Sequence, residues 1–486
     1  MNQENAKDYD VLVIGGGNAA LCAAITAREQ GASVLLLECA PKHFRGGNSR
    51  HTRNMRLAHE TQIDPYTGAY PAEEMWNNYI KATGGATDLE LAKQVIYNSA
   101  SVLEWMKDHG VRFQPAITGT LHLSRTNAWF MGGGKAMINT LYRSAEKLGV
   151  HIRYNAEVVG LDVQDGHFRS ASVLVDGQAT EKVAAKAVVV GAGGFQSNLE
   201  WLRKAWGPVS DNFLIRGTPY DTGTLLKILL DHGAQPIGDP TQAHMVPIDA
   251  RSPKFDGGIV TRLDCVILGI VVNKDGERFY DEGEDFWGMR YAIWGRLIAQ
   301  QKDQISYVFI DSKTFDRFMP SVFPPIKGQT IAEVAEQFNL PVAKVEATIA
   351  TFNKAVQPGN FDHTVFDDCK TSGLTPPKTH WALRIDDPPF YGYPLRPGLT
   401  FTYFGLTVDK RAAVIMKGGK PAKNIYATGE IMAGNILPKG YIGGVGLVIG
   451  NIFGRTAGAE AAGFAKNSGA LQQNSTVKEG RSNGGK

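Results

Sequence analysis

Short apolar runs alternate with glycine-containing turns and helical patterns along most of the chain. Tyr9–Ile14 reads as a buried strand, Leu21–Gln30 as an alanine-rich helix and Ser33–Glu38 as a second buried strand. This order predicts a β–α–β unit. Lys186–Phe195 and Asn424–Glu430 each begin as a buried strand and end in a glycine-containing turn. Because ligands bind at the carboxyl ends of parallel strands, we expect the three turns to share one crevice.

The three strand-and-turn blocks are far apart in the sequence, which predicts a domain assembled from both ends of the chain. We expect an α/β, Rossmann-like domain made from residues 1–207 and 376–465. Residues 208–375, which mix proline-rich loops with helical stretches, are expected to form an inserted α+β domain. Residues 466–486 are rich in Gly, Ser, Asn and Gln and are expected to be disordered.

The first glycine-rich turn has the features of a dinucleotide site. Gly15 suits the tight turn off the strand, Gly17 leaves room for a pyrophosphate, and Ala20 permits close helix–strand packing. The free N–H groups at the start of the helix favour phosphate, and Glu38 can bind a ribose hydroxyl. The alternative is a glycine-rich turn that binds nothing. The expected dinucleotide-binding positions are Gly15, Gly17, Asn18, Ala19, Ala20 and Glu38.

The charge balance of the chain is close to even. The 486 residues carry a formal net charge of +3, and 43% of them are hydrophobic. Residues 466–486 contain four basic residues and one acidic residue, so they account for this excess. A nucleic-acid surface would need basic residues clustered on the fold, and we therefore expect no nucleic-acid partner.

The cysteines and the first residues of the chain indicate whether a metal site is expected and in which compartment the protein is expected. Cys22, Cys39, Cys265 and Cys369 are scattered and form no Cys-x-x-Cys pair, so we expect no metal site. Unpaired thiols fit a reducing compartment. The polar start MNQENAKDYD has no signal-peptide pattern, and no apolar run reaches the roughly 18 residues of a membrane span. A cytoplasmic protein is expected.

Several unusual strings resemble the fumarate reductase/succinate dehydrogenase flavoprotein family. They include GGGNAALCAA, RGGNSRHTRN, RTNAWFMGGGKA, ERFYDEGEDFW and MAGNILPKGYIGGVG, and the likeness extends from about Tyr9 to Ala465. The resemblance implies an FAD domain, a mobile capping domain formed by the inserted segment, and an active site between them. It also implies oxidation or reduction of a carbon–carbon bond beside a carboxylate.

Within this family the strings are most similar to a branch that oxidises a small tricarboxylate. That likeness implies a membrane-associated iron–sulfur/haem protein as electron acceptor, which would bring the protein to the inner membrane. Ser49 stands where some members carry the histidine that attaches FAD covalently, so non-covalent FAD is expected, although His51 is close by. The further cofactor-binding positions implied are Gly46, Gly47, Asn48, Ser49, Gly133, Gly134, Val158, Gly193, Gly194, Glu430, Gly444 and Val445.

The resemblance suggests three candidates for the proton transfer. Arg290 takes the position of an arginine that donates the proton in the family's soluble reductases, so it would have to accept one in the oxidation. An arginine has a free pKa above about 12, which makes it an unusual base. Tyr403 and Tyr441 are the alternative bases, because a phenolate forms more readily beside cations.

Four residues are expected to hold the substrate. His244 and Thr261 match family positions that bind a substrate carboxylate, whereas Arg262 stands where the reductases carry a relay glutamate. Tyr441 lies near the place of a family arginine, and Lys439 could supply the charge instead. An added cation suits a third carboxylate. The alternatives are a dehydrogenase for another di- or tricarboxylate or for a 3-ketosteroid, and a flavoprotein that only shuttles electrons.

Overall fold

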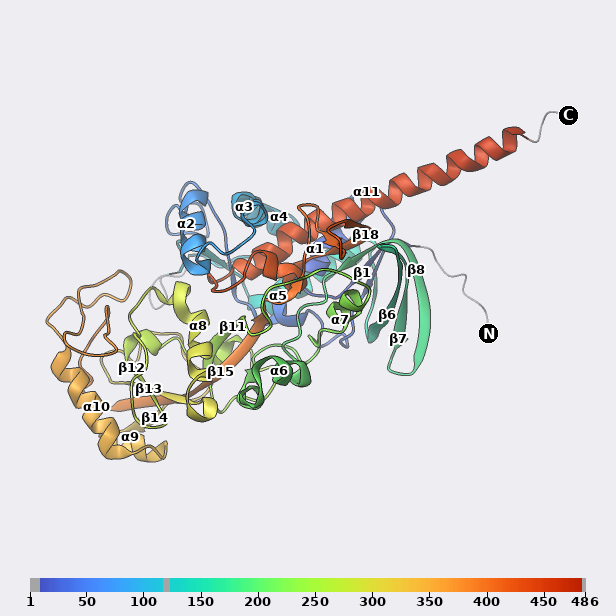
Figure 1. The fold of residues 1–486 in the computed structure, drawn as a ribbon. Coiled ribbons are helices and arrows are strands. Elements are labelled where there is room, and N and C mark those ends of the chain that lie inside the picture. Colours follow the sequence, from blue (N-terminus) through green and yellow to red (C-terminus); the bar gives the residue numbers. More distant parts are fainter. Residues whose placement is uncertain (1–8, 117–122, 483–486) are drawn as a thin grey trace.

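The computed structural model describes residues 9–116 and 123–482. Its largest sheet contains the three strands that the sequence analysis singled out, as Figure 1 shows. The path through this sheet is β17-β18-β8-β1-β2-β5, and the hairpin β6–β7 is attached to β8. The strands are β1 Tyr9–Ile14, β2 Val34–Leu37, β5 His151–Arg153, β6 Ala156–Gln164, β7 His167–Val175, β8 Ala179–Val190, β17 Ala413–Ile415 and β18 Pro421–Ala427.

The parallel register explains how distant segments meet. Leu12 on β1 pairs with Leu35 on β2 and with Val188 on β8, and Val188 in turn pairs with Ile425 on β18. The facing stretches are apolar and buried, which is typical of a parallel sheet covered on both faces. The glycine-containing turns after β1, β8 and β18 therefore lie at one edge of the sheet, and the predicted α/β class is confirmed.

A second sheet of mixed strands forms the other body of the molecule. β15 lies at its centre and pairs with β9, β11, β13 and β14, while β12 pairs with β13. The strands are β9 Leu214–Ile215, β11 Ala243–Asp249, β12 Ile270–Asn273, β13 Ser306–Ile310, β14 Ile326–Gly328 and β15 Phe390–Thr402. Short strands β3 Asn54–Arg56, β4 Asn127–Trp129, β10 Pro236–Ile237 and β16 Gly405–Leu406 form two small pairs.

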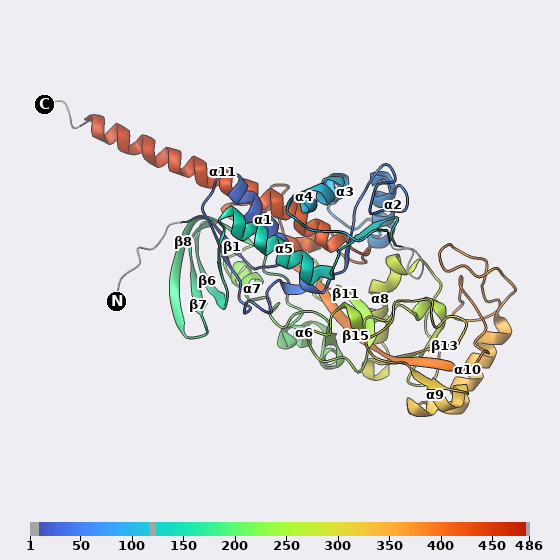
Figure 2. The same cartoon turned by 180° about the vertical axis from the view of Figure 1, so that it is seen from behind.

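The helices divide between the two sheets. In Figures 1 and 2, α1, α5 and the start of α11 lie together against the main sheet, whereas α9 and α10 lie at the far end of the second body. The helices are α1 Asn18–Glu29, α2 Ala72–Thr83, α3 Leu89–Asn98, α4 Ala100–Asp108, α5 Gly133–Leu148, α6 Leu199–Trp206, α7 Thr224–Asp231, α8 Trp287–Ala299, α9 Ile331–Gln337, α10 Val342–Ala355 and α11 Val445–Ser482. A separate apolar core, which includes Phe309, Phe338 and Phe352, packs α9 and α10 on the second sheet.

The structure differs from two of the expected boundaries. β15 spans Phe390–Thr402 and belongs to the second sheet, so the second body extends well past residue 375. Helix α11 continues to Ser482 and so includes most of the tail 466–486 that was expected to be disordered. No proline interrupts this segment, and its Ala, Leu, Gln and Lys residues are good helix formers. Residues 483–486 lie outside the described part of the chain.

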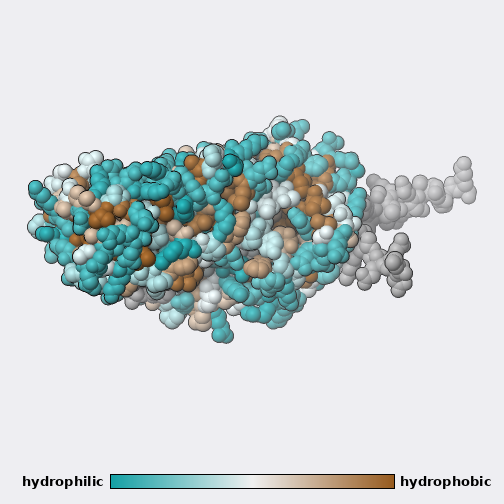
Figure 3. Space-filling model, turned by 90° about the horizontal axis from the view of Figure 1, so that it is seen from below, coloured by the Kyte–Doolittle hydropathy of each residue, from teal (hydrophilic) through white to brown (hydrophobic). Residues whose placement is uncertain are grey.

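The surface carries no membrane-spanning element in the described segments. Across residues 9–116 and 123–482, no helix combines the length and the apolar character that a bilayer crossing requires. The face in Figure 3 is mostly hydrophilic, and its hydrophobic residues form separate patches.

A row of glycines lets the last helix approach the first. A Cβ atom on Gly454 would lie 2.5 Å from the Ala19 carbonyl oxygen, and one on Gly458 would lie 2.3 Å from the Ala23 carbonyl oxygen. Real Cβ atoms do not come this close to backbone, so α1 and α11 touch through main chain. The start of the dinucleotide helix is thus held in place by the C-terminal helix.

Replacing Gly458 by Ala should therefore lower the free energy of unfolding by about 2 kcal/mol, because the added methyl group forces two helices apart. Gly463 is the matched control, since it lies in the same helix and a Cβ there would meet nothing within 4 Å. Gly463→Ala should raise stability by about 0.5–1 kcal/mol through helix propensity. Urea unfolding followed by circular dichroism measures both, and equal effects would contradict the close contact.

Candidate active site

A large cavity opens at the edge where β1, β8 and β18 end. Its empty volume of about 1540 Å³ includes space that is open to solvent. The lining extends from the Gly15 turn to His244 and Tyr291. Its lining combines the glycine turns of the main sheet with residues from β11, β15 and α8 of the second body.

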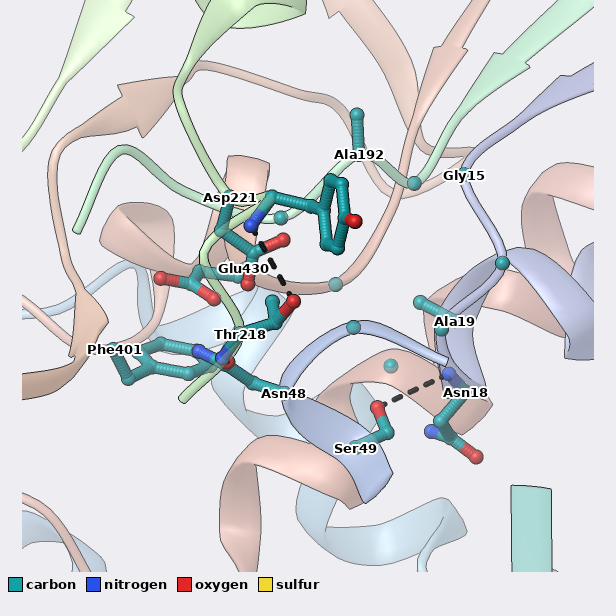
Figure 4. A pocket seen from close by; sticks show the side chains of 18 of the residues that line it. Gly15, Asn18, Ala19, Asn48, Ser49, Ala192, Thr218, Asp221, Phe401 and Glu430 are labelled. Carbon is teal, nitrogen blue, oxygen red and sulfur yellow. Dashed lines mark hydrogen bonds between the residues drawn. The ribbon is translucent and has the colours of Figure 1, made fainter. Parts of the chain in front are cut away.

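The first turn has a shape that only glycine permits. Gly15 has φ +109°, and a Cβ there would lie 2.3 Å from the Gly191 carbonyl oxygen. A Cβ on Gly16 would lie 2.0 Å from the Tyr142 hydroxyl oxygen. Figure 4 shows the Asn18 N–H, at the start of α1, donating to the Ser49 Oγ at 3.1 Å. This bond joins the loop 47–51 to the helix N-terminus, which is the arrangement that favours a phosphate.

The predicted cofactor positions divide into those that line the cavity and those that support it. The positions on the wall are Gly15, Gly17, Asn18, Ala19, Glu38, Gly47, Asn48, Ser49, Val158, Gly193, Glu430 and Gly444. The positions outside the lining are Ala20, Gly46, Gly133, Gly134, Gly194 and Val445. Several of the second group pack directly behind the wall: Ala20 meets Gly191, Gly134 sits under Ser49, and Gly194 lies beside Glu430.

Glu38 directly follows β2 and lines the cavity, where the ribose-binding carboxylate was expected. Its Oε1 accepts the Ala40 N–H at 2.9 Å, and its Oε2 accepts the Gly46 N–H at 3.3 Å. Burial raises the pKa of this carboxyl, although both backbone N–H groups oppose the rise. A buried carboxyl that still lines the cavity is suited to a sugar hydroxyl, which can donate to it.

Two buried carboxyls face each other further along the cavity, as Figure 4 shows for Asp221 and Glu430. The Gln196 amide donates to Asp221 Oδ2 at 2.7 Å and to Glu430 Oε2 at 3.4 Å. The Thr402 N–H donates to Glu430 Oε1 at 2.8 Å. Burial raises the pKa of Glu430 to about 8, and burial together with the charge of Glu430 raises the pKa of Asp221 well above its ordinary value.

The raised pKa of Glu430 implies a pH dependence with a definite sign. The folded-state pKa of about 8 exceeds the ordinary glutamate pKa of 4.5, so the folded state binds the proton more tightly. The stabilisation is complete below about pH 4.5 and is lost as the pH rises through about 8. Urea unfolding of the flavin-free protein between pH 5 and pH 8 should therefore show a fall in unfolding free energy.

Glu430→Gln replaces the carboxyl by a neutral group of nearly the same shape. It should reduce the fall in unfolding free energy between pH 5 and pH 8 by an amount on the order of 2 kcal/mol. Asp221 titrates together with Glu430, so some pH dependence should remain. The exposed Glu104→Gln is the control and should leave the fall unchanged. An unaltered pH dependence in Glu430→Gln would refute a neutral buried carboxyl at this position.

The opposite end of the cavity gathers cations and aromatic rings from both bodies. His244 lies on β11, Tyr291 on α8, and Tyr441 just before α11. The His244 Nε2 lies 3.1 Å from the Tyr291 hydroxyl oxygen, and the His244 and Tyr441 ring centroids are 4.1 Å apart. The Arg262 guanidinium stands 4.6 Å from the centre of the Tyr291 ring. Arg216 and Arg53 line the same end.

A single carboxylate orders part of this cationic end. Asp264 Oδ1 lies 2.7 Å from Arg262 Nε and accepts the Trp287 indole N–H at 2.5 Å. Its Oδ2 accepts from Arg53 at 3.1 Å. Asp264 is 2% exposed, so these charge-assisted bonds are shielded from water and fix both arginines.

Burial controls the charge states at this end. The pKa of His244 is held well below its ordinary value by burial and by Arg216, so its imidazole is neutral at pH 7. Burial also raises the pKa of Tyr291, and the charges of Arg262, Arg216 and Arg56 oppose that rise. Burial likewise raises the pKa of Tyr441, whose hydroxyl oxygen accepts the Gly446 N–H at 3.0 Å. A neutral imidazole beside a phenol can accept its hydrogen bond and relay a proton.

His244, Arg262 and Tyr441 thus lie together in the cavity, but four other predicted residues do not line it. Arg290 forms an ion pair with Glu284 and donates to the Tyr280 hydroxyl at 2.8 Å, outside the cavity. The expectation that Arg290 takes part in the proton step stays a prediction, and in this structure the next residue of α8, Tyr291, lines the cavity instead.

The remaining three residues lie behind or beside the wall. The Thr261 hydroxyl donates to the Gly258 carbonyl oxygen at 2.9 Å, so it closes a local turn. The Tyr403 hydroxyl donates to the Gly440 carbonyl oxygen at 2.7 Å. Lys439 packs over Gly84 at the end of α2. Each is placed by structural contacts, and none of the three side chains lines the cavity.

Tyr291, Asp221 and Asp264 were missed in the sequence, although α8 carried a usable signal. The buried residues of α8 recur at helical spacing and include Trp287, Tyr291, Trp294 and Ile298, whereas Arg290 falls off this stripe. Asp221 and Asp264 follow no recognisable motif in the sequence. Across the described ranges, no cluster of three or more His, Cys, Asp or Glu side chains could hold a metal ion.

The solved structures that resemble this chain share its architecture. The open conformation of a flavocytochrome c3 fumarate reductase superposes with a TM-score of 0.72 at 24% identity, over 95% of this chain and 79% of that one. The 3-ketosteroid-Δ4-(5α)-dehydrogenase of Rhodococcus jostii RHA1 gives a TM-score of 0.72 at 21% identity, over 95% and 98%. Identities this low show the fold alone.

Sequence comparison gives the family. The NADH:fumarate oxidoreductase of Klebsiella pneumoniae (strain 342) is 26% identical over 474 residues, which cover 96% of this chain and 49% of that protein. The chain therefore spans about half the length of this relative. A family model described as FAD binding domain matches residues 10–447. The glycine turns, Glu38 and the buried carboxyls fit the phosphates and hydroxyls of FAD, and the chain belongs to the FAD-binding-domain family of flavoproteins.

Proposed function

We propose that the protein is an FAD-dependent dehydrogenase that oxidises tricarballylate, propane-1,2,3-tricarboxylate, to cis-aconitate. The observation that carries this proposal is one continuous cavity that joins the dinucleotide turn of Gly15 to a buried end containing Arg216 and Arg262. A substrate with several carboxylates matches buried cations, because each pairing restores the charge balance that burial disturbs. The similarity to fumarate-type oxidoreductases supports reaction at a carbon–carbon bond.

The reaction requires two C–H bonds to break while a C=C bond forms. A carbon beside a carboxylate loses a proton, and the neighbouring carbon loses a hydride. FAD, held by the glycine turns and the carboxyls described above, supplies the hydride acceptor when bound. The remaining tasks fall to residues of this chain: they hold the carboxylates, exclude water and receive the proton.

Tyr291 is the proton acceptor in this proposal, with His244 as its partner. The Tyr291 hydroxyl lies 3.1 Å from His244 Nε2, so its proton can move to the neutral imidazole as the phenolate oxygen takes a proton from the substrate. Arg262, 4.6 Å from the Tyr291 ring, stabilises the phenolate. Tyr441 is the second candidate, since it also lines the cavity and its ring lies against His244.

Arg262 and His244 are the substrate-binding residues that remain from the sequence-based set. Asp264 fixes the Arg262 guanidinium in one orientation, which lowers the entropy lost when a carboxylate binds to it. Electrons then leave for a membrane-associated iron–sulfur/haem protein, as the resemblance implies. The NADH:fumarate oxidoreductase is about twice as long as this chain, so the similarity to it does not identify the electron acceptor. The electron-accepting partner is therefore part of the proposal.

The cavity argues against the two alternative functions. A 3-ketosteroid is largely apolar, and binding it would leave Arg216 desolvated without an anion. A flavoprotein that only shuttles electrons has no need of a buried cationic end beside the cofactor cavity. Another di- or tricarboxylate is the alternative that the same residues serve best.

Mixing the purified flavoprotein with tricarballylate in the absence of oxygen should bleach the flavin absorbance near 450 nm, a general property of flavin reduction. The product should be cis-aconitate by chromatography. Succinate and 4-androstene-3,17-dione are the comparison compounds. Bleaching by the steroid but not by tricarballylate would overturn the substrate assignment.

Tyr291→Phe should slow this reduction by at least about 100-fold, because general base catalysis typically contributes that much. Tyr280→Phe is the matched control, since Tyr280 bonds to Glu284 outside the cavity, and it should reduce the flavin at the normal rate. Stopped-flow absorbance measures both, with bound FAD checked beforehand. A normal rate in Tyr291→Phe together with a lost rate in Arg290→Gln would return the proton step to Arg290.

A further inference from the structure

Arg216 occupies the junction between the two bodies of the molecule. It directly follows β9, whose residues Leu214 and Ile215 pair with Gly398 and Leu399 of β15. Its backbone N–H donates to the Leu399 carbonyl oxygen at 2.9 Å. The residue is 5% exposed and its side chain lines the cavity. The arginine is therefore held on a rigid strand pair, close to where cofactor and substrate regions meet.

The hydrogen bonding of Arg216 is incomplete. Its Nε donates to the Thr400 Oγ1 at 2.8 Å, whereas one terminal nitrogen, NH1, is buried and has no partner. No carboxylate within the described residues forms an ion pair with it. A buried guanidinium without an anion is costly, because the charge has lost its water and gained little in return.

The neighbouring arginines differ from Arg216 in this respect. Arg262 and Arg53 both pair with Asp264, so one carboxylate serves two of the three arginines at this end, and Arg216 is the arginine left without an ion pair in the described residues. His244 adds no compensating negative charge. A bound anion would balance this excess of positive charge.

We propose that Arg216 binds one carboxylate of an oligocarboxylate ligand, separately from the carboxylate at Arg262, and thereby selects for ligands with more than one carboxylate. This inference about Arg216 rests on the proposed function in one respect only, because it takes the oligocarboxylate ligand to be the substrate. Neither a monocarboxylate nor an uncharged ester can neutralise both arginines. An arginine presents paired N–H groups that match a carboxylate, so the free NH1 group suits this partner.

A second source of negative charge would be a reduced, anionic flavin, and the surroundings of Arg216 favour the substrate. The residues that interact electrostatically with it are Tyr291, Tyr441, Asp264, His244 and His51, and Asp264 already pairs with Arg262 and Arg53. His244, Tyr291 and Tyr441 form the aromatic end of the cavity. The pKa of His51 is lowered to about 4 by burial and by neighbouring cations that include Arg216, while Asp256, 2.5 Å from its Nε2, opposes the shift. Because Asp264 and Asp256 pair with other groups, the Arg216 NH1 group stays without an anion.

The test uses the oxidised holoenzyme and citrate as the probe. Citrate has three carboxylates, and its central carbon carries no hydrogen, so the dehydrogenation cannot proceed and binding alone is measured. Isothermal titration should show citrate binding to the unsubstituted protein. Arg216→Gln should weaken that binding about 10- to 100-fold, the loss expected for one charge-assisted pair. The monocarboxylate propionate should bind far more weakly to both proteins, and trimethyl citrate should not bind.

Arg396→Gln is the matched control. Arg396 lies on β15, the strand that pairs with β9, its guanidinium donates to the Asp303 carbonyl oxygen at 2.9 Å, and it does not line the cavity. This variant should bind citrate normally. If Arg216→Gln fails to retain FAD, Arg216→Lys carries the test, because it keeps the charge but loses the paired N–H groups. It should bind citrate at least about threefold more weakly.

Unchanged citrate affinity in Arg216→Gln, or in Arg216→Lys where that variant carries the test, would overturn the proposal. So would an absence of citrate binding to the unsubstituted protein. A lower flavin reduction potential in Arg216→Gln with normal citrate affinity would also overturn it and assign the cation to the reduced flavin. If citrate binding depends on Arg216 while tricarballylate fails to bleach the flavin, the anion site stands and the substrate assignment alone fails.

Discussion

Contact between bare backbones at the end of the parallel strands is the constraint on which the rest of the structure depends. The turn after β1 and the turn after β8 meet at Gly15 and Gly191, where any side chain would collide. On the other side of α1, Gly454 and Gly458 allow the last helix to press on the first. Because these contacts leave no room for adjustment, the N–H groups at the start of α1 are fixed in direction before any ligand arrives.

The long strand β15 connects the second sheet to the cavity. Its far half is the centre of the second sheet, and its end reaches the cavity with Thr400 and Phe401. The Thr400 carbonyl oxygen accepts from the Asn48 amide, and the Thr402 N–H donates to Glu430. One strand thus touches two loops that approach the cofactor and also orients Arg216. This strand therefore contacts both the loops at the dinucleotide site and the cationic end of the cavity.

The fold was predictable from the sequence because its signals are local. Apolar strands, glycine turns and the carboxylate after β2 all follow from neighbouring residues, and the three blocks meet as expected. The site was less predictable, because it is made by contacts between residues such as His244 and Tyr291, which lie 47 positions apart. Arg290 shows the limit clearly. A family position pointed to it, while a shift of one residue around α8 puts an aromatic ring in the cavity instead.

The packing of α11 on α1 also has a consequence for the order of events during biosynthesis. The Asn18 amide at the start of α1 donates to the Leu447 carbonyl oxygen, 429 positions later in the chain. At typical translation speeds these two residues leave the ribosome roughly 20 to 90 s apart. Through that interval the nucleotide-binding strands exist without the helix that completes them. The contact between α1 and α11 can therefore form only after residues 445–458 have been made, and until then the earlier segments depend on their own apolar core to avoid aggregation.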